Sequence, residues 1–252
     1  MTGERRQRTR IAINDQLSVI VTDDGSQTLY DEVVGESFHS ESGAESESRT
    51  VFLENSGVQE NLKLNRPTRV LEIGFGVGLN FLFTANVALS LGNVPLEYVG
   101  IDVRFPFSAI RHVGSNLIPQ FESIRLCEEY NVWFASQTEI GIEFQRVWRF
   151  AEPSRLLLWQ GDARSCCSDL IESGERFGFI YHDAFSPATS PELWTEEFFR
   201  TEFELMLPGG TLSTYCVKRE IQDRLRRVGF QIRKMKGPAG GKREVLTATR
   251  PN

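Results

Sequence analysis

The chain has 252 residues and a formal net charge of −6, with 40% hydrophobic and 25% charged residues, as in globular proteins with one sizeable core. No apolar run approaches the roughly 20 residues of a membrane-spanning helix, and the start of the chain lacks the apolar stretch of a secretory signal. Four cysteines without a C-x-x-C pair and only three histidines argue against a zinc site or a disulfide framework, so we expect a cytoplasmic protein without a bound metal.

The first 65 residues precede the main pattern of the chain. Residues 1–10 are rich in arginine and are predicted to form a disordered basic arm. Residues 11–22 alternate well enough for a strand, and Asp23-Asp24-Gly25-Ser26 forms the turn after it. We expect residues 11–65 to form a β-rich extension that packs on the core.

Predicted strands and helices alternate through residues 66–252, which we expect to form one α/β core. Such alternation indicates a mostly parallel sheet covered by helices on both faces. Residues 117–152 break the rhythm and are predicted to be a helical, aromatic-rich insertion whose rings mainly pack in the core. The predicted strands are 69–73, 98–103, 156–160, 179–182, 211–216, 231–233 and 244–249, and the helices are 80–91, 108–116, 168–173, 192–205 and 219–228.

A glycine-rich loop follows the first core strand, in the form Glu72-x-Gly74-x-Gly76-x-Gly78. The dinucleotide fingerprint G-x-G-x-x-G would need a glycine at Leu79, and no Lys-Ser/Thr pair follows for a phosphate loop. The remaining pattern is typical of S-adenosylmethionine-dependent methyltransferases with a Rossmann-like fold. The pattern predicts that Glu72, Gly74, Phe75, Gly76, Gly78 and Asn80 bind the cofactor. The alternative is a glycine-rich turn that binds no ligand.

Further acids stand at predicted strand ends. In an open α/β sheet, ligands bind beyond the carboxyl ends of the strands. Asp102 follows the glycine loop by about 24 residues and is expected to accept hydrogen bonds from ribose hydroxyls. Asp162 and Ala163 are expected near the adenine amino group. Any one of these acids is more often a helix cap than a ligand, but their combination with the glycine loop favours a cofactor site.

The fourth strand leads into His182-Asp183-Ala184-Phe185-Ser186-Pro187. Asp183 falls where the methyl acceptor is expected, and a carboxylate there can hold an amine and take its proton. Phe185 and Pro187 offer an apolar wall for an extruded base. Capping of the next helix is the alternative role of Asp183, but that helix begins after Pro191.

The C-terminal part of the chain is basic. Between Lys218 and Arg250, eleven basic residues oppose three acids, a net charge of +8, which leaves about −14 for the rest. A basic segment on an acidic body indicates a surface for a polyanion. The alternative is a solvated helix face, since Arg224, Arg226 and Arg227 can simply point to water.

These motifs together resemble the methyltransferase domain of the MnmC family over residues 20–250. That family methylates the 5-aminomethyl group of wobble (2-thio)uridine in tRNA. The resemblance implies that Asp183 lies beside the acceptor amine and that Glu47 lies near the active site. It also implies that Lys242 and Arg243 lie close to the tRNA or brace the site. The motifs are Gly74-Phe-Gly-Val-Gly-Leu-Asn-Phe-Leu82, Asp183-Ala-Phe-Ser-Pro-Ala188, Pro191-Glu-Leu-Trp194, Pro208-Gly-Gly-Thr-Leu212, Lys242-Arg-Glu-Val245, Tyr30-Asp31-Glu32, Ser37-Phe38-His39-Ser40 and Glu47-Ser48-Arg49-Thr50-Val51-Phe52-Leu53.

The family pattern also includes a flavin-dependent oxidase domain, for which this chain has no counterpart after residue 252. We therefore expect a stand-alone methyltransferase whose aminomethyl precursor comes from a separate enzyme. Two other functions stay open on the residues alone. One is a polyamine aminopropyltransferase, which would have an acid-lined pocket and no use for the basic segment. The other is a non-catalytic cofactor-binding or RNA-binding module.

Overall fold

The computed structural model describes residues 9–113, 124–137 and 144–252. The predicted basic arm lies almost entirely outside these ranges. The described chain begins with a small antiparallel sheet in the order β1-β2-β3-β4. Its strands are β1 (Arg10–Ala12), β2 (Leu17–Val21), β3 (Gln27–Asp31) and β4 (Glu36–Ser37).

The prediction of one strand over residues 11–22 is wrong, because a turn divides it. The Asn14 side-chain oxygen accepts hydrogen bonds from the backbone N–H groups of Gln16 and Leu17, at 2.8 and 2.9 Å. Such a local side-chain bond competes with strand pairing and reverses the chain. The prediction of a β-rich N-terminal segment agrees with the observed sheet.

The central sheet of the described residues has the strand order β11-β12-β10-β9-β5-β6-β8-β7. Neighbours from β10 to β8 pair in parallel, whereas β7, β11 and β12 pair antiparallel. The mostly parallel sheet was predicted. The strands are β5 (Thr68–Ile73), β6 (Leu96–Asp102), β7 (Phe144–Ala151), β8 (Ser154–Gln160), β9 (Phe177–His182), β10 (Met206–Thr214), β11 (Gln231–Lys236) and β12 (Glu244–Thr249).

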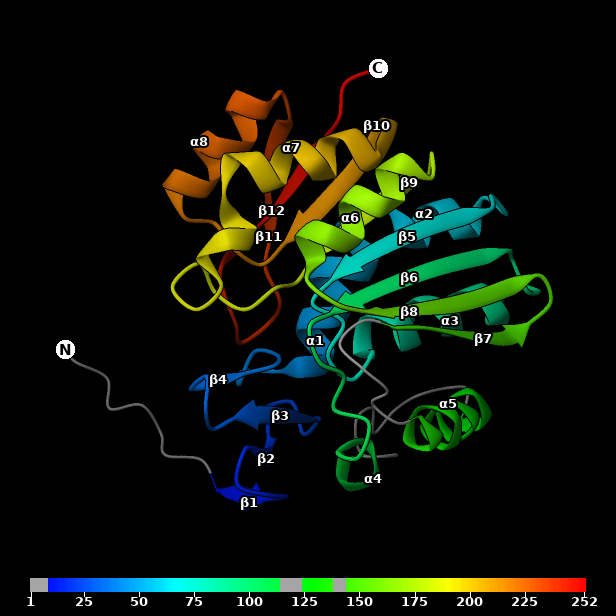
Figure 1. Ribbon diagram of the computed structural model, residues 1–252, viewed down its shortest axis with the longest axis vertical. Coiled ribbons are helices and arrows are strands. Elements are labelled where there is room, and N and C mark those ends of the chain that lie inside the picture. Colours follow the sequence, from blue (N-terminus) through cyan, green and yellow to red (C-terminus); the bar gives the residue numbers. More distant parts are fainter. Residues whose placement is uncertain (1–8, 114–123, 138–143) are drawn as a thin grey trace.

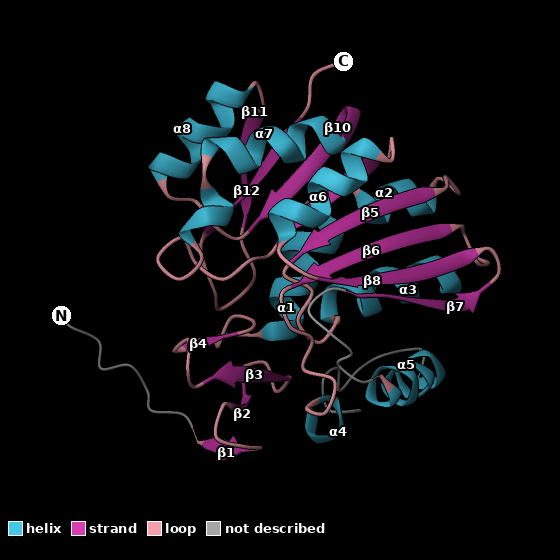
Figure 2. Ribbon diagram, viewed as in Figure 1, coloured by secondary structure: helices cyan, strands magenta, loops and turns pink. Residues whose placement is uncertain are grey.

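Helices cover both faces of this sheet (Figure 2). One core contains Val70 and Tyr98 with side chains from α2, α3 and α5, and the other contains Leu71 and Val99 with side chains from α6, α7 and α8. Alternate residues of one buried parallel strand thus serve opposite cores. The helices are α1 (Ala44–Glu47), η1 (a π-helical turn, Ser48–Glu54), α2 (Val58–Lys63), α3 (Leu79–Ser90), α4 (Ile110–Val113), α5 (Ile124–Ser136), α6 (Ala163–Glu172), η3 (a 3₁₀ turn, Pro191–Trp194), α7 (Glu196–Leu205) and α8 (Arg219–Val228).

The predicted helical insertion at residues 117–152 is only partly helical. Helix α5 agrees with it, but residues 144–151 form β7, an antiparallel edge strand on β8. Trp148 and Phe150 occur at alternate positions of β7 and pack edge-on against Phe81 of α3. This period of two is the signal of a strand. The remaining parts of the prediction, at residues 117–123 and 138–143, lie outside the described residues.

The strand order reverses between β5 and β9. The chain runs from β5 to β6 and β8 on one side, and then crosses to β9 on the other side of β5. The small sheet β1–β4 lies beside the carboxyl ends of these strands (Figure 1). Because ligands of open α/β sheets bind at such a reversal point, this arrangement places a covered site there.

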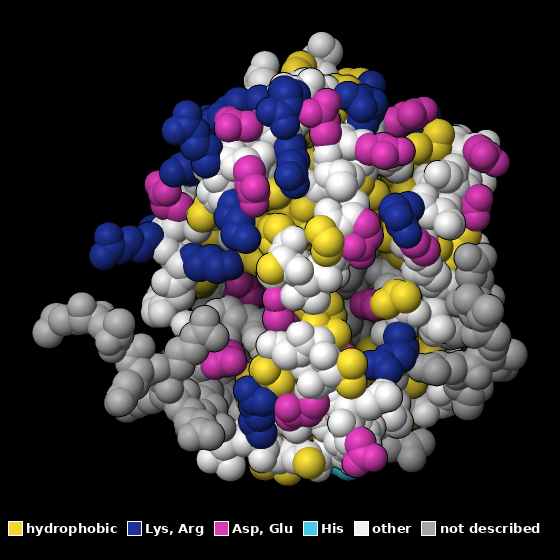
Figure 3. Space-filling view, turned by 60° about the vertical axis from the view of Figure 1, so that its left-hand side comes forward, with side chains coloured by type: hydrophobic (Ala, Val, Ile, Leu, Met, Phe, Trp, Pro, Cys, Tyr) yellow, Lys and Arg dark blue, Asp and Glu magenta, His cyan; other side chains and the backbone are white. Residues whose placement is uncertain are grey.

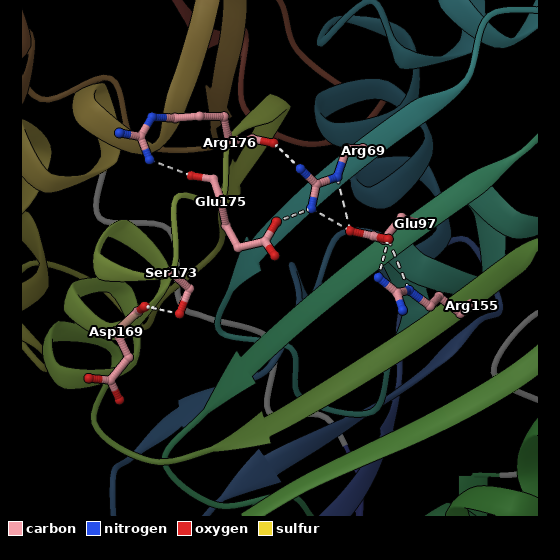
Figure 4. Close-up of polar contacts among 7 residues, drawn as sticks. All are labelled: Arg69, Glu97, Arg155, Asp169, Ser173, Glu175 and Arg176. Atoms are coloured by element: carbon pink, nitrogen blue, oxygen red, sulfur yellow. Dashed lines mark hydrogen bonds and ion pairs between the residues drawn. The ribbon is translucent and has the colours of Figure 1, made fainter.

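A network of charges joins the amino ends of the same strands, at the opposite edge (Figure 4). Arg69 of β5 forms ion pairs with Glu97 of β6 and with Glu175, and its guanidinium donates to the Arg176 carbonyl at 2.6 Å. Arg155 of β8 donates to the other oxygen of Glu97 at 2.9 Å. The network ties three neighbouring strands together away from the cleft.

Within the described ranges, no helix is long and apolar enough to cross a membrane.

Candidate cofactor and acceptor site

A cleft of about 1270 Å³ lies between the sheet β1–β4 and the carboxyl ends of β5, β6, β8 and β9. Figure 3 shows the hollow across the middle of the molecule, with acidic side chains in its walls. Ten of the predicted site residues line it: Glu47, Gly74, Phe75, Gly76, Asp102, Asp162, Ala163, Asp183, Phe185 and Lys242.

The glycine loop connects β5 to α3, and Gly74, Gly76 and Gly78 all have positive φ angles, of 87°, 56° and 80°. A Cβ at Gly74 would lie 2.5 Å from the carbonyl oxygen of Asp183. The glycine therefore lets the ends of β5 and β9 touch. The absence of a Cβ at Gly74 thus serves contact with the protein's own backbone.

Behind the loop, one amide joins two carboxyl groups. Asn80 donates from Nδ2 to Glu72 at 2.6 Å and to Asp183 at 2.9 Å. The Tyr98 hydroxyl donates to the second Glu72 oxygen at 2.7 Å. Glu72 is 1% exposed, and its burial raises its pKa to about 8. Through Asn80, the buried Glu72 side chain thus helps to fix the glycine loop against α3.

Asp183 is the central polar group of the acceptor side. It directly follows β9, and its backbone N–H donates to the Ile73 carbonyl at 2.9 Å. Burial, reinforced by the negative charges of Glu47 and Glu72, raises the pKa of Asp183 well above its usual range. The Asn80 hydrogen bond and the positive charge of Lys242 act in the opposite direction. The buried carboxyl group therefore holds a proton more readily than an ordinary aspartate does.

Glu47 reaches the same cleft from the end of α1. It is 6% exposed and accepts a hydrogen bond from the Ser40 backbone N–H at 2.7 Å. Burial raises its pKa as well. Glu47 and Asp183 face Lys242, whose Nζ lies 4.0 Å from the centre of the Tyr215 ring. The two carboxyl groups give this end of the cleft hydrogen-bond acceptors for the N–H groups of an amine.

Two further acids border the other half of the cleft. Asp102 ends β6 and accepts hydrogen bonds from the backbone N–H groups of Gly76, at 2.9 Å, and Arg104, at 3.2 Å. Asp162 caps helix α6 by accepting from the Arg164 N–H at 2.8 Å, and it also pairs with the Arg164 side chain. The capping role considered for strand-end acids thus applies to Asp162. Asp102 keeps lone pairs for further donors.

Aromatic rings form the acceptor wall. Phe185 follows Asp183 and meets Phe38, from the segment after β4, edge-on with ring centres 5.5 Å apart. The Tyr215 hydroxyl donates to the Ala184 carbonyl at 2.8 Å, and the Trp194 indole N–H donates to the Phe185 carbonyl at 2.8 Å. The backbone on both sides of Phe185 is therefore fixed by neighbouring elements.

His182 precedes Asp183 and points to the opposite face of the sheet. Its Nδ1 lies 2.8 Å from a Glu202 oxygen of α7, and both side chains are fully buried. The Trp194 ring packs on His182 with centres 4.3 Å apart. No role was assigned to His182 from the sequence. Its side chain packs under the loop of residues 183–190, which we call the acceptor loop, and does not line the cleft.

The cleft fits S-adenosylmethionine. Asp102 offers free lone pairs at a strand end, the glycine loop offers a surface without side chains at Gly74 and Gly76, and acids stand at the other end for a cationic group. Residues 122–251 match the model of a family described as S-adenosyl-L-methionine-dependent methyltransferase. The chain belongs to this family. It is therefore an enzyme that uses S-adenosylmethionine, as predicted.

Curated relatives cover most of the chain. A tRNA 5-methylaminomethyl-2-thiouridine biosynthesis bifunctional protein MnmC from Leptospira borgpetersenii serovar Hardjo-bovis (strain JB197) is 31% identical over 220 residues, which are 85% of this chain and 32% of that protein. The protein of the same name from Azoarcus sp. (strain BH72) is 29% identical over 242 residues, 91% of this chain and 35% of that protein. The chain thus spans about a third of the length of these relatives. The predicted resemblance to MnmC proteins is confirmed.

A solved structure has the same fold. MNMC2 from Aquifex aeolicus superposes with a TM-score of 0.74 at 24% identity, covering 96% of this chain and 74% of that one. The likeness confirms the predicted Rossmann-like methyltransferase fold.

Five predicted site residues lie outside the cleft lining, although all are described. Glu72 and Asn80 are buried behind the loop. Gly78 stands directly before α3, and a Cβ there would lie 2.3 Å from the Tyr130 hydroxyl. Pro187 and Arg243 do not border the cleft. Phe75 borders it, but its ring packs edge-on against Phe105 in the core, so its side chain is structural.

Three of the cleft residues that were not predicted are important for the acceptor side. Phe38 and Glu36 come from the N-terminal segment, and Tyr215 follows β10. Tyr215 was within reach of sequence reasoning, because it stands just after a strand that neighbours β9. Phe38 lies within the Ser37–Ser40 motif, but only the fold shows that this motif crosses the cleft.

The basic C-terminal segment is partly neutralised by internal contacts. Arg227 pairs with Glu196 at 2.7 Å, Arg226 with Asp223 at 2.9 Å, and Lys234 with Glu244 at 2.9 Å. Arg224 and Arg250 donate to backbone carbonyls of Trp194 and Phe203. Basic side chains still gather on the upper part of Figure 3. Fewer basic side chains of this segment are therefore available to a polyanion than its net charge of +8 indicated.

Proposed function

We propose that this methyltransferase acts on the amine of a 5-aminomethyl group on the wobble (2-thio)uridine of tRNA. The observation that carries the proposal is the position of the buried Asp183 carboxyl group, which lines the cleft at the reversal point beside the glycine loop and is held there by Asn80. The raised pKa of Asp183 supports a role in proton transfer. The names of the MnmC relatives support the product, 5-methylaminomethyl-2-thiouridine.

The cofactor half of the cleft would be formed by the residues around the glycine loop. Asp102 would accept the ribose hydroxyls, Gly74 and Gly76 would border the methionine part, and the backbone of Asp162 and Ala163 would border the adenine. The side chain of Asp162 would contribute less, because Arg164 already occupies both of its oxygens. When bound, S-adenosylmethionine supplies an electrophilic methyl group.

The acceptor half would prepare the amine. An aminomethyl group is protonated in neutral water and has no free lone pair until it loses a proton. Asp183 and Glu47 would bind the ammonium form, and the Asp183 carboxylate would take one of its protons. Its raised pKa makes this proton transfer easier than it would be for an ordinary carboxylate. The nitrogen lone pair would then be free to attack in line, while the carboxyl groups keep it oriented.

The base and the tRNA backbone would use the outer parts of the cleft. Phe185 would stack on the base, and Lys242 at the cleft edge and Arg243 beside it would approach phosphates. Pro187 lies outside the cleft lining, so of the two residues predicted for the wall we retain Phe185. We further propose that the reaction takes place in the cytoplasm and that a separate activity supplies the aminomethyl precursor.

The test is transfer of labelled methyl from S-adenosylmethionine to tRNA that carries 5-aminomethyluridine, followed by nucleoside analysis. Label in 5-methylaminomethyluridine is expected. Label in another nucleoside would contradict the proposed acceptor. If tRNA stays unlabelled while small aliphatic amines are modified, the acidic cleft serves a polyamine-type substrate instead.

A further inference from the structure

The segment Glu36–Ser40, which we call the strap, crosses the cleft between the small sheet and the acceptor loop. Glu36 accepts hydrogen bonds from the Ser186 backbone N–H at 3.1 Å and from the side chains of Ser186 and Thr189. At the other end, the Ser40 N–H donates to Glu47. The strap is therefore anchored at both ends by hydrogen bonds that do not involve Phe38.

Phe38 lies in the middle of the strap, and its ring borders both halves of the site. It meets Phe185 edge-on, at an interplanar angle of 83°. On its other side, a ring carbon lies 3.1 Å from where a Cβ at Gly76 would stand. Phe38 is half-buried and lines the cleft. A single ring thus spans from the cofactor loop to the acceptor wall.

We propose that Phe38 is a specificity-determining residue that selects planar, aromatic acceptors for the amine methylation. This inference rests on the proposed function and extends it to a residue outside the core. Two rings at nearly a right angle form an apolar corner, so that a base stacked on one ring meets the other ring with its edge. An aliphatic amine has no planar face and gains nothing from this corner.

The gain expected from the corner is considerable. Stacking of a base on an aromatic side chain contributes about 5- to 150-fold in affinity. Because the Phe38 ring lies close to Gly76, it would also help to exclude water between the glycine loop and Asp183 once a base is bound. Phe38 would therefore affect the acceptor more than it affects cofactor binding.

The alternative is that Phe38 only braces the small sheet. Phe203 provides the comparison, since it is also half-buried and meets Phe230 edge-on at 4.9 Å, away from the cleft. Phe38→Leu and Phe203→Leu each remove one ring while keeping apolar volume. Phe38→Tyr keeps the ring and serves as the conservative variant.

The experiment measures kcat and KM for tRNA carrying 5-aminomethyluridine, the Kd for S-adenosylmethionine, and Tm for the wild type and the three variants. For Phe38→Leu we expect kcat/KM for tRNA to fall about 10-fold or more, with cofactor Kd changed less than about 3-fold. Phe38→Tyr is expected to retain most of the activity. Phe203→Leu is expected to lower Tm without this loss.

Three results would overturn the inference. They are an unchanged kcat/KM in Phe38→Leu, a loss shared equally by Phe203→Leu, and a loss explained by weaker cofactor binding. If the wild type does not methylate this tRNA at all, the proposed function fails, and the inference fails with it. Activity of the wild type together with normal activity of Phe38→Leu would remove only the inference.

Discussion

The side-chain amide of Asn80 donates a hydrogen bond to Asp183 over 2.9 Å, and so links the first turn of α3 to the end of β9. The same nitrogen also donates to Glu72 at 2.6 Å. One buried amide thus fixes the position of the acceptor carboxylate relative to the glycine loop.

Asn80→Leu keeps the volume of the side chain but removes this donor. The hydrogen bond lowers the pKa of Asp183, so its loss raises that pKa further. Because the proposed reaction needs ionised Asp183, the acidic limb of the profile of kcat/KM against pH should move to higher pH. Asn61→Leu is the control, since Asn61 bonds to Thr68 at the amino end of β5. A lower rate with an unmoved limb would contradict the assignment.

Glu72→Gln should change how stability depends on pH. Burial raises the pKa of Glu72 from 4.5 to about 8. The folded protein therefore favours the protonated form of Glu72. The contribution of this form to the stability of the fold is complete below pH 4.5 and is lost as the pH rises toward 8. Glutamine does not ionise, and the Tyr98 hydroxyl can rotate to accept from its amide. Between pH 4.5 and 7 the variant should gain about 3 kcal/mol in unfolding free energy relative to the wild type.

Urea unfolding at several pH values measures this difference. A difference between Glu72→Gln and the wild type that stays constant with pH would show that Glu72 does not titrate in this range.

Glu97→Gln should weaken the network at the amino ends of the strands. Burial opposes ionisation of Glu97, but hydrogen bonds from Arg69 and Arg155 outweigh it and lower its pKa. We expect a loss of about 1–2 kcal/mol near pH 7, because both arginines lose a charged partner, while kcat stays unchanged. The stabilisation by Glu97 is present above the unfolded pKa near 4.5 and is lost as pH falls through the lower folded value.

Thermal unfolding and activity assays test this, with Glu60→Gln as control for an exposed pair with Lys63. Equal effects of the two variants on Tm would mean that the network adds no more than a surface ion pair.

Replacing Lys242 and Arg243 by glutamate should weaken tRNA binding. Both side chains are exposed, and neither forms a salt bridge in the described structure. If they contact phosphates, the slope of log K against log salt should become shallower by about one to two. Lys63→Glu, on α2, is the control. Unchanged affinity and slope would place the tRNA on another surface.

The glycine loop and the strand-end acids could be predicted from the sequence because their signals are local. Gly74 and Gly76 stand in a short pattern after an apolar strand, and Asp102 and Asp183 end strands. The general rule for open sheets then brings these ends to one edge.

The strap that crosses the cleft could not be predicted in the same way. Glu36 bonds to Ser186, 150 positions further along the chain, and no local pattern records such a contact. The internal pairing of the basic segment could not be predicted for a related reason. Arg227 finds its partner, Glu196, on another helix, so its pairing depends on how α7 and α8 pack.

The most direct test compares wild type, Asp183→Asn and Asp169→Asn in transfer of labelled methyl to tRNA carrying 5-aminomethyluridine. Asn keeps the shape of Asp183 but cannot take a proton, whereas Asp169 is exposed on α6 outside the cleft. We predict label in 5-methylaminomethyluridine with the wild type and with Asp169→Asn. For Asp183→Asn we predict that turnover falls by about 10²-fold or more while cofactor affinity stays near normal. Equal turnover in all three proteins would contradict the role of Asp183 as the group that prepares the amine.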